Sequence, residues 1–268
     1  MPHSITVDEK ENIWITDIAL HQVLRFSKND RSKPDLIIGA KMTPGRDENH
    51  FCKPTDVAVA SDGTFFVTDG YCNSRVLKFD KDGKFIKEWG TKLKEENDPY
   101  NLLIPHAIEL IEEKDLVAVA DREHGRVVFY GAGLQNKDAT GIFIDQIIVP
   151  GESPLVYGVS INDKFGDIYV LSSQSITEPM HVEVYSSSNL DFKYFINPEE
   201  SIGWAHEISS CPPGSYDDNE QNCLAIASLM ESCLSVYDCI GEIGQTNKTA
   251  VFMLNIKESS VSFIENVF

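Results

Sequence analysis

The chain has 268 residues, and its 23 Lys and Arg against 42 Asp and Glu give a formal net charge of −19 at pH 7. The 42% hydrophobic and 24% charged residues form an ordinary globular composition, which excludes a mainly disordered chain. Such an acidic surface repels nucleic-acid phosphates and anionic lipid. No apolar run approaches the roughly 20 residues that span a bilayer. We therefore expect no nucleic-acid partner and no membrane partner for this segment.

A repeat of 52 residues organises the first half of the sequence. It is carried by three matching segments, Ile13–Asp17, Phe65–Asp69 and Val117–Asp121, whose last aspartates are 52 residues apart in both intervals. Each segment has three other short apolar segments around it, joined by turns rich in Gly, Asp and Asn. Four short strands per unit are typical of a β-propeller blade, so the sequence predicts an all-β protein with a single propeller domain over residues 1–268.

The same period predicts two more blades. The fourth falls on Tyr169–Ser173, where Ser replaces Asp. The fifth should fall near residue 225, but its best match is Ala250–Met253, so we expect an insertion in the last blade around residues 209–240, with a loop between Cys211 and Cys239. The alternative is an irregular β-sandwich, which would not produce a fixed period.

Three histidines occupy the same position in alternate units. His3, His106 and His206 each open the first strand of a unit, and they are 103 and 100 residues apart, close to two periods. First strands line the central channel of a propeller, and alternate blades of a six-bladed ring are evenly spaced, so the three imidazoles should converge. Three neutral imidazoles with a fourth position open are the ligand set of a catalytic zinc ion. The alternative is three unrelated histidines; the other four, expected at the surface, are His21, His50, His124 and His181.

The six cysteines weakly favour an oxidising compartment. Cys52 and Cys72 lie in turn-like segments, and the sequon at Asn247 predicts glycosylation there. We therefore expect the lumen of the secretory pathway or secretion. No signal peptide is visible, and we explain this by an N-terminal part that is missing from the chain. The pairing of the remaining cysteines, Cys211, Cys223, Cys233 and Cys239, stays open, with Cys211 and Cys223 as our preferred pair.

The sequence also resembles a known family. The resemblance is carried by Pro2–Ser4, Trp14–Val23, Asn49–Val59, Asp69–Arg75 and Ala120–Arg126; it is dense over residues 2–130 and thin from residue 150. These segments resemble the peptidyl-α-hydroxyglycine α-amidating lyases, the lyase domain of peptidylglycine α-amidating monooxygenase. The resemblance implies a six-bladed NHL-repeat propeller that cleaves peptidyl-α-hydroxyglycine into a peptide amide and glyoxylate. This is the second step of C-terminal peptide amidation, as in neuropeptide processing, and it implies a hydroxylating monooxygenase as a partner or neighbouring domain.

The resemblance also assigns roles to residues of this chain. The implied sites are zinc on His3, His106 and His206, an active-site pair of Tyr71 and Arg122, a disulfide between Cys52 and Cys72, and a structural calcium on the Ile5 carbonyl and Glu207. The chemistry agrees, because breaking a carbinolamide requires a Lewis acid and a group that moves a proton from oxygen to nitrogen. Tyr71 could be that group if a metal and a cation lower its pKa from about 10, and Arg122 could hold a carboxylate with two hydrogen bonds. The structural alternatives are a tyrosine packed beside the disulfide and an arginine paired with Asp121 or Glu123.

The chain departs from the family in three places. Trp204 and Glu207 stand where the family has a pocket methionine and a calcium-binding aspartate. The positions of a second family disulfide are Ala118 and Phe129. The family also has a blade before the first histidine, so we expect about five blades here, with the N-terminal blade missing and an open wedge between blades one and five.

Two other functional classes remain open. One is a non-catalytic NHL propeller that binds a protein or peptide and needs no metal. The other is a propeller hydrolase of the lactonase kind, which holds calcium with carboxylates and Asn. Histidines at the axis make the second less suitable, because calcium prefers oxygen ligands. Zinc content separates the first from a zinc lyase.

Overall fold

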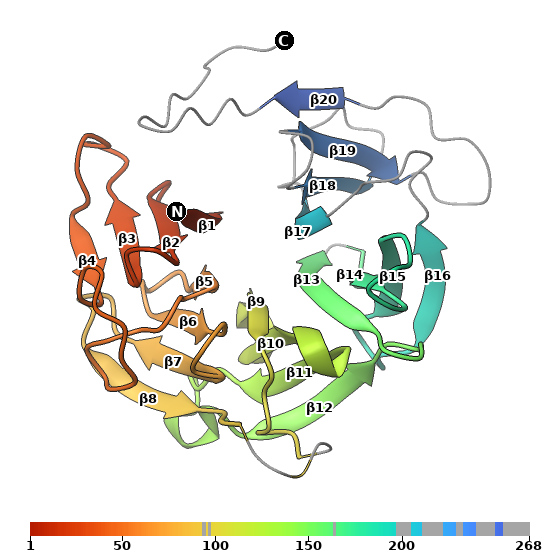
Figure 1. The fold of residues 1–268 in the computed structure, drawn as a ribbon, viewed down its shortest axis with the longest axis horizontal. Coiled ribbons are helices and arrows are strands. Elements are labelled where there is room, and N and C mark those ends of the chain that lie inside the picture. The colour runs from red at the N-terminus through yellow and green to blue at the C-terminus, as the bar shows by residue number, and fades with distance from the viewer. Residues whose placement is uncertain are drawn as a thin grey trace.

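Five four-stranded antiparallel sheets stand around a common axis in the computed structural model (Figure 1). The structure describes residues 1–92, 95, 98–162, 165–196, 205–210, 222–228, 233–239 and 250–253. Among them, helical structure is limited to three short turns, Glu112–Lys114, Arg122–His124 and Lys137–Ala139. None of the described helices has the length and apolar character needed to cross a membrane. The predicted all-β propeller is confirmed.

Each sheet consists of four consecutive strands, and we number the sheets as blades one to five. Blade one contains β1 (Pro2–Val7), β2 (Ile13–Asp17), β3 (Gln22–Phe26) and β4 (Leu36–Ile38). Blade two contains β5 (Asp56–Val59), β6 (Phe65–Asp69), β7 (Arg75–Phe79) and β8 (Phe85–Trp89). Blade three contains β9 (Pro105–Ile111), β10 (Leu116–Asp121), β11 (Arg126–Gly131) and β12 (Phe143–Ile148). Blade four contains β13 (Leu155–Asn162), β14 (Asp167–Ser173), β15 (His181–Ser186) and β16 (Phe192–Ile196). Blade five contains β17 (Ala205–Ser210), β18 (Asn222–Ser228), β19 (Cys233–Cys239) and β20 (Ala250–Met253).

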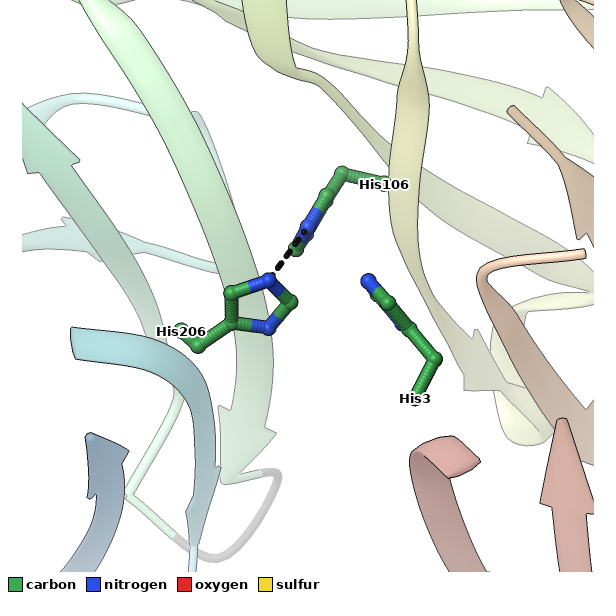
Figure 2. A group of neighbouring side chains, drawn as sticks. All are labelled: His3, His106 and His206. Carbon is green, nitrogen blue, oxygen red and sulfur yellow. Dashed lines mark hydrogen bonds between the residues drawn. The ribbon is translucent and has the colours of Figure 1, made fainter. Parts of the chain in front are cut away.

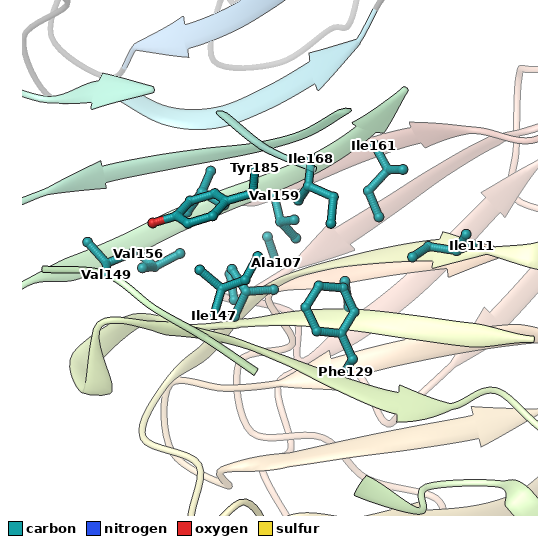
Figure 3. Close-up of a cluster of buried hydrophobic side chains, with 14 residues drawn as sticks. Ala107, Ile111, Phe129, Ile147, Val149, Val156, Val159, Ile161, Ile168 and Tyr185 are labelled. Carbon is teal, nitrogen blue, oxygen red and sulfur yellow. The ribbon is translucent and has the colours of Figure 1, made fainter. Parts of the chain in front are cut away.

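The hydrophobic core lies between the blades. Every residue of β6 and β7 is buried, since neighbouring blades cover both faces of these middle strands, whereas the outer strand β8 is half exposed. Three of the five residues in each of these two strands are apolar. Figure 3 shows the largest cluster, in which Phe129 and Ala107 of blade three pack against Val159 and Tyr185 of blade four. This blade-on-blade packing holds the first strand of each blade at the axis (Figure 1).

The repeating aspartates hold the chain segments that lead into the first strands of blades two and three. Buried Asp69 pairs with buried Arg75 at 3.0 Å and accepts a hydrogen bond from the Cys52 amide at 2.8 Å. Asp121 repeats this arrangement with Arg126 at 2.8 Å and with the Leu103 amide at 2.7 Å. These two aspartates thus tie the chain segment entering each blade to the end of its second strand, whereas Asp17 accepts from the Ala19 and Leu20 amides of the following turn.

The prediction for blade five was wrong in one respect. The expected loop between Cys211 and Cys239 contains β18 and β19, and Ala250–Met253 is the fourth strand of the blade rather than its second. β18 spans residue 225, where the period places the second strand. The loop was predicted from the turn-forming residues at 211–214 and 216–220 and from the four nearby cysteines, but Cys is a small apolar residue that suits a strand.

Several predictions for the C-terminal part lie outside the described residues. These are the loop cysteine Cys211, the glycosylation site Asn247 and the pocket substitution Trp204. For Cys223, Cys233 and Cys239 the backbone alone is described, so their pairing stays a prediction.

Blades one and five do not stand side by side around the ring (Figure 1). Ile5 and Val7 of β1 are 49% and 62% exposed, so no described sheet covers that side of blade one. The described strands agree with the expected open wedge.

Candidate metal centre

The three predicted histidines meet at the axis (Figure 2). They come from β1, β9 and β17, and their ring centroids are 4.9 Å apart for His3 and His106, 4.6 Å for His3 and His206, and 4.5 Å for His106 and His206. One ring nitrogen of each lies within 4.8 Å of the other two. Three nitrogens at this spacing can bind a single ion between them.

A β-bulge aims each of these side chains. The pairing register shifts by one residue between Pro2 and Ser4, leaving His3 as the extra residue, and equivalent shifts leave out His106 and His206. A bulge locally reorients a side chain away from the regular alternation of a strand. The histidines therefore share a backbone geometry as well as a sequence position.

Backbone carbonyls fix the tautomers of two of the rings. Nδ1 of His3 lies 2.7 Å from the carbonyl oxygen of Thr55, and Nδ1 of His106 lies 2.6 Å from that of Tyr157. Because a carbonyl can only accept, each Nδ1 carries the hydrogen and donates it. The lone pair is then on Nε2, as at protein metal sites where a hydrogen bond orients the ligating ring.

All three imidazoles are neutral at physiological pH. Burial, with a smaller effect of the nearby Arg122 charge, lowers the pKa of His3 to about 4 and that of His206 to about 3. Burial also holds the pKa of His106 well below its usual value, with the other two rings adding to the effect. Neutral imidazole is the form that binds zinc, so the donor set fits this metal.

Tyr71 lies directly against the cluster. Its hydroxyl is 2.9 Å from Nε2 of His3 and 3.4 Å from Nε2 of His106. The guanidinium carbon of Arg122 lies 5.6 Å from the centre of the Tyr71 ring. Burial raises the pKa of Tyr71, while the positive charge and hydrogen bond of Arg122 oppose that rise. The structure thus brings both predicted active-site residues to the histidines.

Arg122 is held by the acidic residue next to it. Its Nε and Nη2 donate to one carboxylate oxygen of Glu123 at 2.9 and 2.6 Å. Asp121, the other expected partner, pairs instead with Arg126 and His124. Glu123 is therefore the counter-ion of Arg122 at the edge of the site.

Three carboxylates gather farther along the same inner strands. Asp56 accepts hydrogen bonds from the Ser4 hydroxyl at 2.6 Å and the Ile108 amide at 2.9 Å, and burial raises its pKa to about 6. Burial and the charges of Asp56 and Glu109 raise the pKa of Glu207 well above its usual value. Such oxygen donors suit calcium, the ion expected on Glu207 and the carbonyl of Ile5. That ion stays a prediction.

The disulfide between Cys52 and Cys72 is confirmed, with a Cα separation of 5.5 Å. It joins the segment before β5 to the turn between β6 and β7, which carries Tyr71. The same turn is held by Asn73, which donates to Asp69 at 2.7 Å. The loop bearing the tyrosine is thus fixed on both sides of that residue.

Replacing both Cys52 and Cys72 with alanine should lower the free energy of unfolding by roughly 3 kcal/mol on the chain-entropy model, since the bond closes a loop with a sequence separation of 20 residues. Urea denaturation of the oxidised proteins measures the difference. With dithiothreitol present in both samples, the wild-type midpoint should fall close to that of the double variant. Equal midpoints for the two oxidised proteins would contradict the prediction.

Sequence reasoning missed two residues. His181, expected at the surface, is buried against Ser172 at 3.3 Å and Glu183 at 3.2 Å. It pairs with β14 at the register position that Arg75 and Arg126 occupy in blades two and three, so its burial follows from the repeat. The second is Tyr157, whose ring lies 5.7 Å from that of His106. Its position in the repeat was visible, but an aromatic residue there has no ligand chemistry to single it out.

Comparison with known proteins gives related sequences. The NHL repeat family matches residues 51–79. A probable peptidyl-α-hydroxyglycine α-amidating lyase of Caenorhabditis elegans is 47% identical over 140 residues, which cover 52% of this chain and 39% of the nematode protein. Peptidyl-glycine α-amidating monooxygenase A of Xenopus laevis is 32% identical over 266 residues, which cover 96% of this chain and 28% of the frog protein. The chain therefore spans well under half the length of these relatives.

Solved structures show the same fold at low sequence identity. Virginiamycin B lyase of Staphylococcus aureus superimposes with a TM-score of 0.59 and 13% identity, over 96% of this chain and 71% of the other. At this identity the similarity concerns the fold alone.

Proposed function

The chain is a homologue of the peptidyl-α-hydroxyglycine α-amidating lyases, and we propose that it cleaves a peptide ending in α-hydroxyglycine into the peptide amide and glyoxylate. One observation carries the proposal: the convergence of three neutral imidazoles with Tyr71 and Arg122. In the reaction, the bond between the amide nitrogen and the α-carbon breaks and its electron pair goes to nitrogen. The hydroxyl oxygen loses its proton and becomes the aldehyde oxygen of glyoxylate.

We assign zinc to His3, His106 and His206, since three neutral nitrogen donors and an open fourth position match its catalytic coordination. The ion would act as a Lewis acid on the substrate oxygen. The carbonyls of Thr55 and Tyr157 would keep two of the ligand rings in the correct tautomer.

Tyr71 is the group we assign to proton transfer. Its hydroxyl oxygen lies within hydrogen-bond reach of Nε2 of His3, and so beside any atom bound at the centre. As phenolate it can take the proton from the substrate hydroxyl, and as phenol it can return that proton to the leaving amide nitrogen. Tyr71 alone can therefore carry out both proton transfers of the reaction.

Arg122 is the group we assign to the substrate carboxylate. Its side chain is 18% exposed, so a ligand can reach it, and its charge is favourable for the carboxylate that glyoxylate retains. The Glu123 carboxylate partly neutralises the Arg122 guanidinium when no substrate is bound. The binding of a planar carboxylate by guanidinium is geometrically specific, which favours the α-hydroxyglycine end of the peptide over its other groups.

Three further assignments belong to this proposal. Calcium on Glu207 and the Ile5 carbonyl would neutralise the buried carboxylates. A hydroxylating monooxygenase, as a domain or a partner, would supply the α-hydroxyglycine substrate. The disulfide supports a location in the secretory lumen or outside the cell.

Glyoxylate release from an α-hydroxyglycine-extended peptide tests the proposal. Protein stripped with a chelator should be inactive, and adding about one zinc per chain should restore release, because the site holds one ion. The same peptide ending in unmodified glycine is the control and should give no glyoxylate. A chain that binds zinc but releases no glyoxylate would refute the lyase function. A chain that neither binds zinc nor releases glyoxylate would favour the non-catalytic propeller.

A further inference from the structure

Tyr157 occupies in blade four the position that the metal-site histidines occupy in their blades. The register between β13 and β14 shifts between Val156 and Gly158, so Tyr157 is the extra residue of a β-bulge. His3, His106 and His206 are the extra residues of equivalent bulges. The backbone therefore directs the Tyr157 side chain toward the same axis.

The Tyr157 ring contacts both parts of the site. Its centroid is 5.7 Å from the ring of His106 and 6.3 Å from that of His206. The guanidinium carbon of Arg122 lies 5.6 Å from the centre of the Tyr157 ring and 5.6 Å from that of Tyr71. Arg122 thus interacts with two aromatic rings as well as with Glu123.

Close packing fixes Tyr157 relative to blade five. The next residue is Gly158, and a Cβ atom placed on it would lie 2.9 Å from a side-chain carbon of Ile208 in β17. Because Gly158 has no side chain, β13 can lie close to β17, the strand that carries His206. The Tyr157 main chain is therefore held against the metal site, and its carbonyl accepts the hydrogen bond of His106 at 2.6 Å.

We infer that Tyr157 is a positioning residue, whose ring holds Arg122 over the site and whose carbonyl orients His106. The role of the ring in substrate binding rests on the proposed lyase function. Arg122 can otherwise turn toward solvent, because its Glu123 partner is 33% exposed and would follow it. Two aromatic faces favour the guanidinium at the site, since a ring attracts a cation over its face.

The experiment compares Tyr157→Phe, which keeps the ring, with Tyr157→Leu, which removes it. Tyr194→Leu, on the exposed outer strand β16, is the matched control. Phenylglyoxal modification of the Arg122 peptide, followed by mass spectrometry, reports on the guanidinium without any assay of activity. Zinc content, KM and kcat for the hydroxyglycine peptide complete the set.

In Tyr157→Leu we expect modification of Arg122 to be faster by roughly fivefold and KM to rise roughly tenfold with little change in kcat, because the lost interaction binds substrate and transition state alike. Tyr157→Phe and Tyr194→Leu should match the wild type within about twofold. Zinc content should stay the same in all variants, since the carbonyl is main-chain.

An unchanged modification rate in Tyr157→Leu would overturn the inference. So would a Tyr157→Phe variant as impaired as Tyr157→Leu, because the hydroxyl would then carry the effect. A wild-type chain without glyoxylate release would refute the lyase function, yet the modification rates would still decide whether Tyr157 positions Arg122.

Discussion

Replacing His106 with alanine should abolish zinc binding and lower glyoxylate release by roughly a thousandfold or more, because two imidazoles would not hold the ion in a three-ligand catalytic site. His106 is the most buried of the three, at 2% exposed, and its ring lies within 5 Å of both others by centroid distance. Zinc per chain after dialysis and the rate of glyoxylate release measure the effect.

The control for this variant is His50→Ala. His50 is partly exposed and bonds to Asp47 at 2.7 Å, outside the cluster, so its replacement should leave zinc content and rate unchanged. Thermal unfolding of the metal-free proteins shows whether His106→Ala still folds. A folded His106→Ala protein that keeps one zinc per chain would disprove the three-histidine site.

Replacing Tyr71 with phenylalanine should lower kcat by roughly two to four orders of magnitude while zinc remains bound, because the proton-transfer group is lost and the imidazoles are untouched. The ring contact with Arg122 survives this change, so KM should change little. Single-turnover glyoxylate release measures the chemical step.

Tyr194→Phe is the matched control for the loss of a hydroxyl, since Tyr194 lies on an exposed outer strand. It should retain the wild-type rate. If Tyr71→Phe kept kcat within about threefold of the wild type, proton transfer would have to be assigned to another group.

Much of the fold and of the site could be predicted from periodicity. The aspartates at 17, 69 and 121 give the blade length, and Asp69 and Asp121 make the same bonds in their blades, whereas Asp17 accepts from the Leu20 amide in the turn that follows it. His3, His106 and His206 stand out because a titratable residue recurs where the chain turns toward the axis. The resemblance then supplied Tyr71 and Arg122. The spacing of residues in the sequence does not predict that these two lie beside the histidines.

The features that periodicity missed depend on contacts between blades. Tyr157 acts through a carbonyl and an aromatic face, and neither leaves a distinctive pattern in a sequence. Ser172 and His181 replace the aspartate and arginine of other blades, and Glu183 contacts both of them, so the usual residue types no longer mark the position. In blade five, turn-forming residues at 211–214 and 216–220 and four cysteines indicated one long loop, so β18 and β19 were missed.

The ligands of the metal centre come from opposite ends of the described chain. His3 and His206 are 203 residues apart in sequence, yet their rings lie 4.6 Å from each other, while the rims of their blades stand apart (Figure 1). An ion bound by these residues would link the first and last described blades, and it would bind only when the stack of blades has its native curvature. The site cannot form in a growing polypeptide until β17 has been made and placed, so metal would be acquired late in assembly rather than early. A substitution in any intervening blade that alters the bend of the stack would then weaken metal affinity from a distance, without touching a ligand.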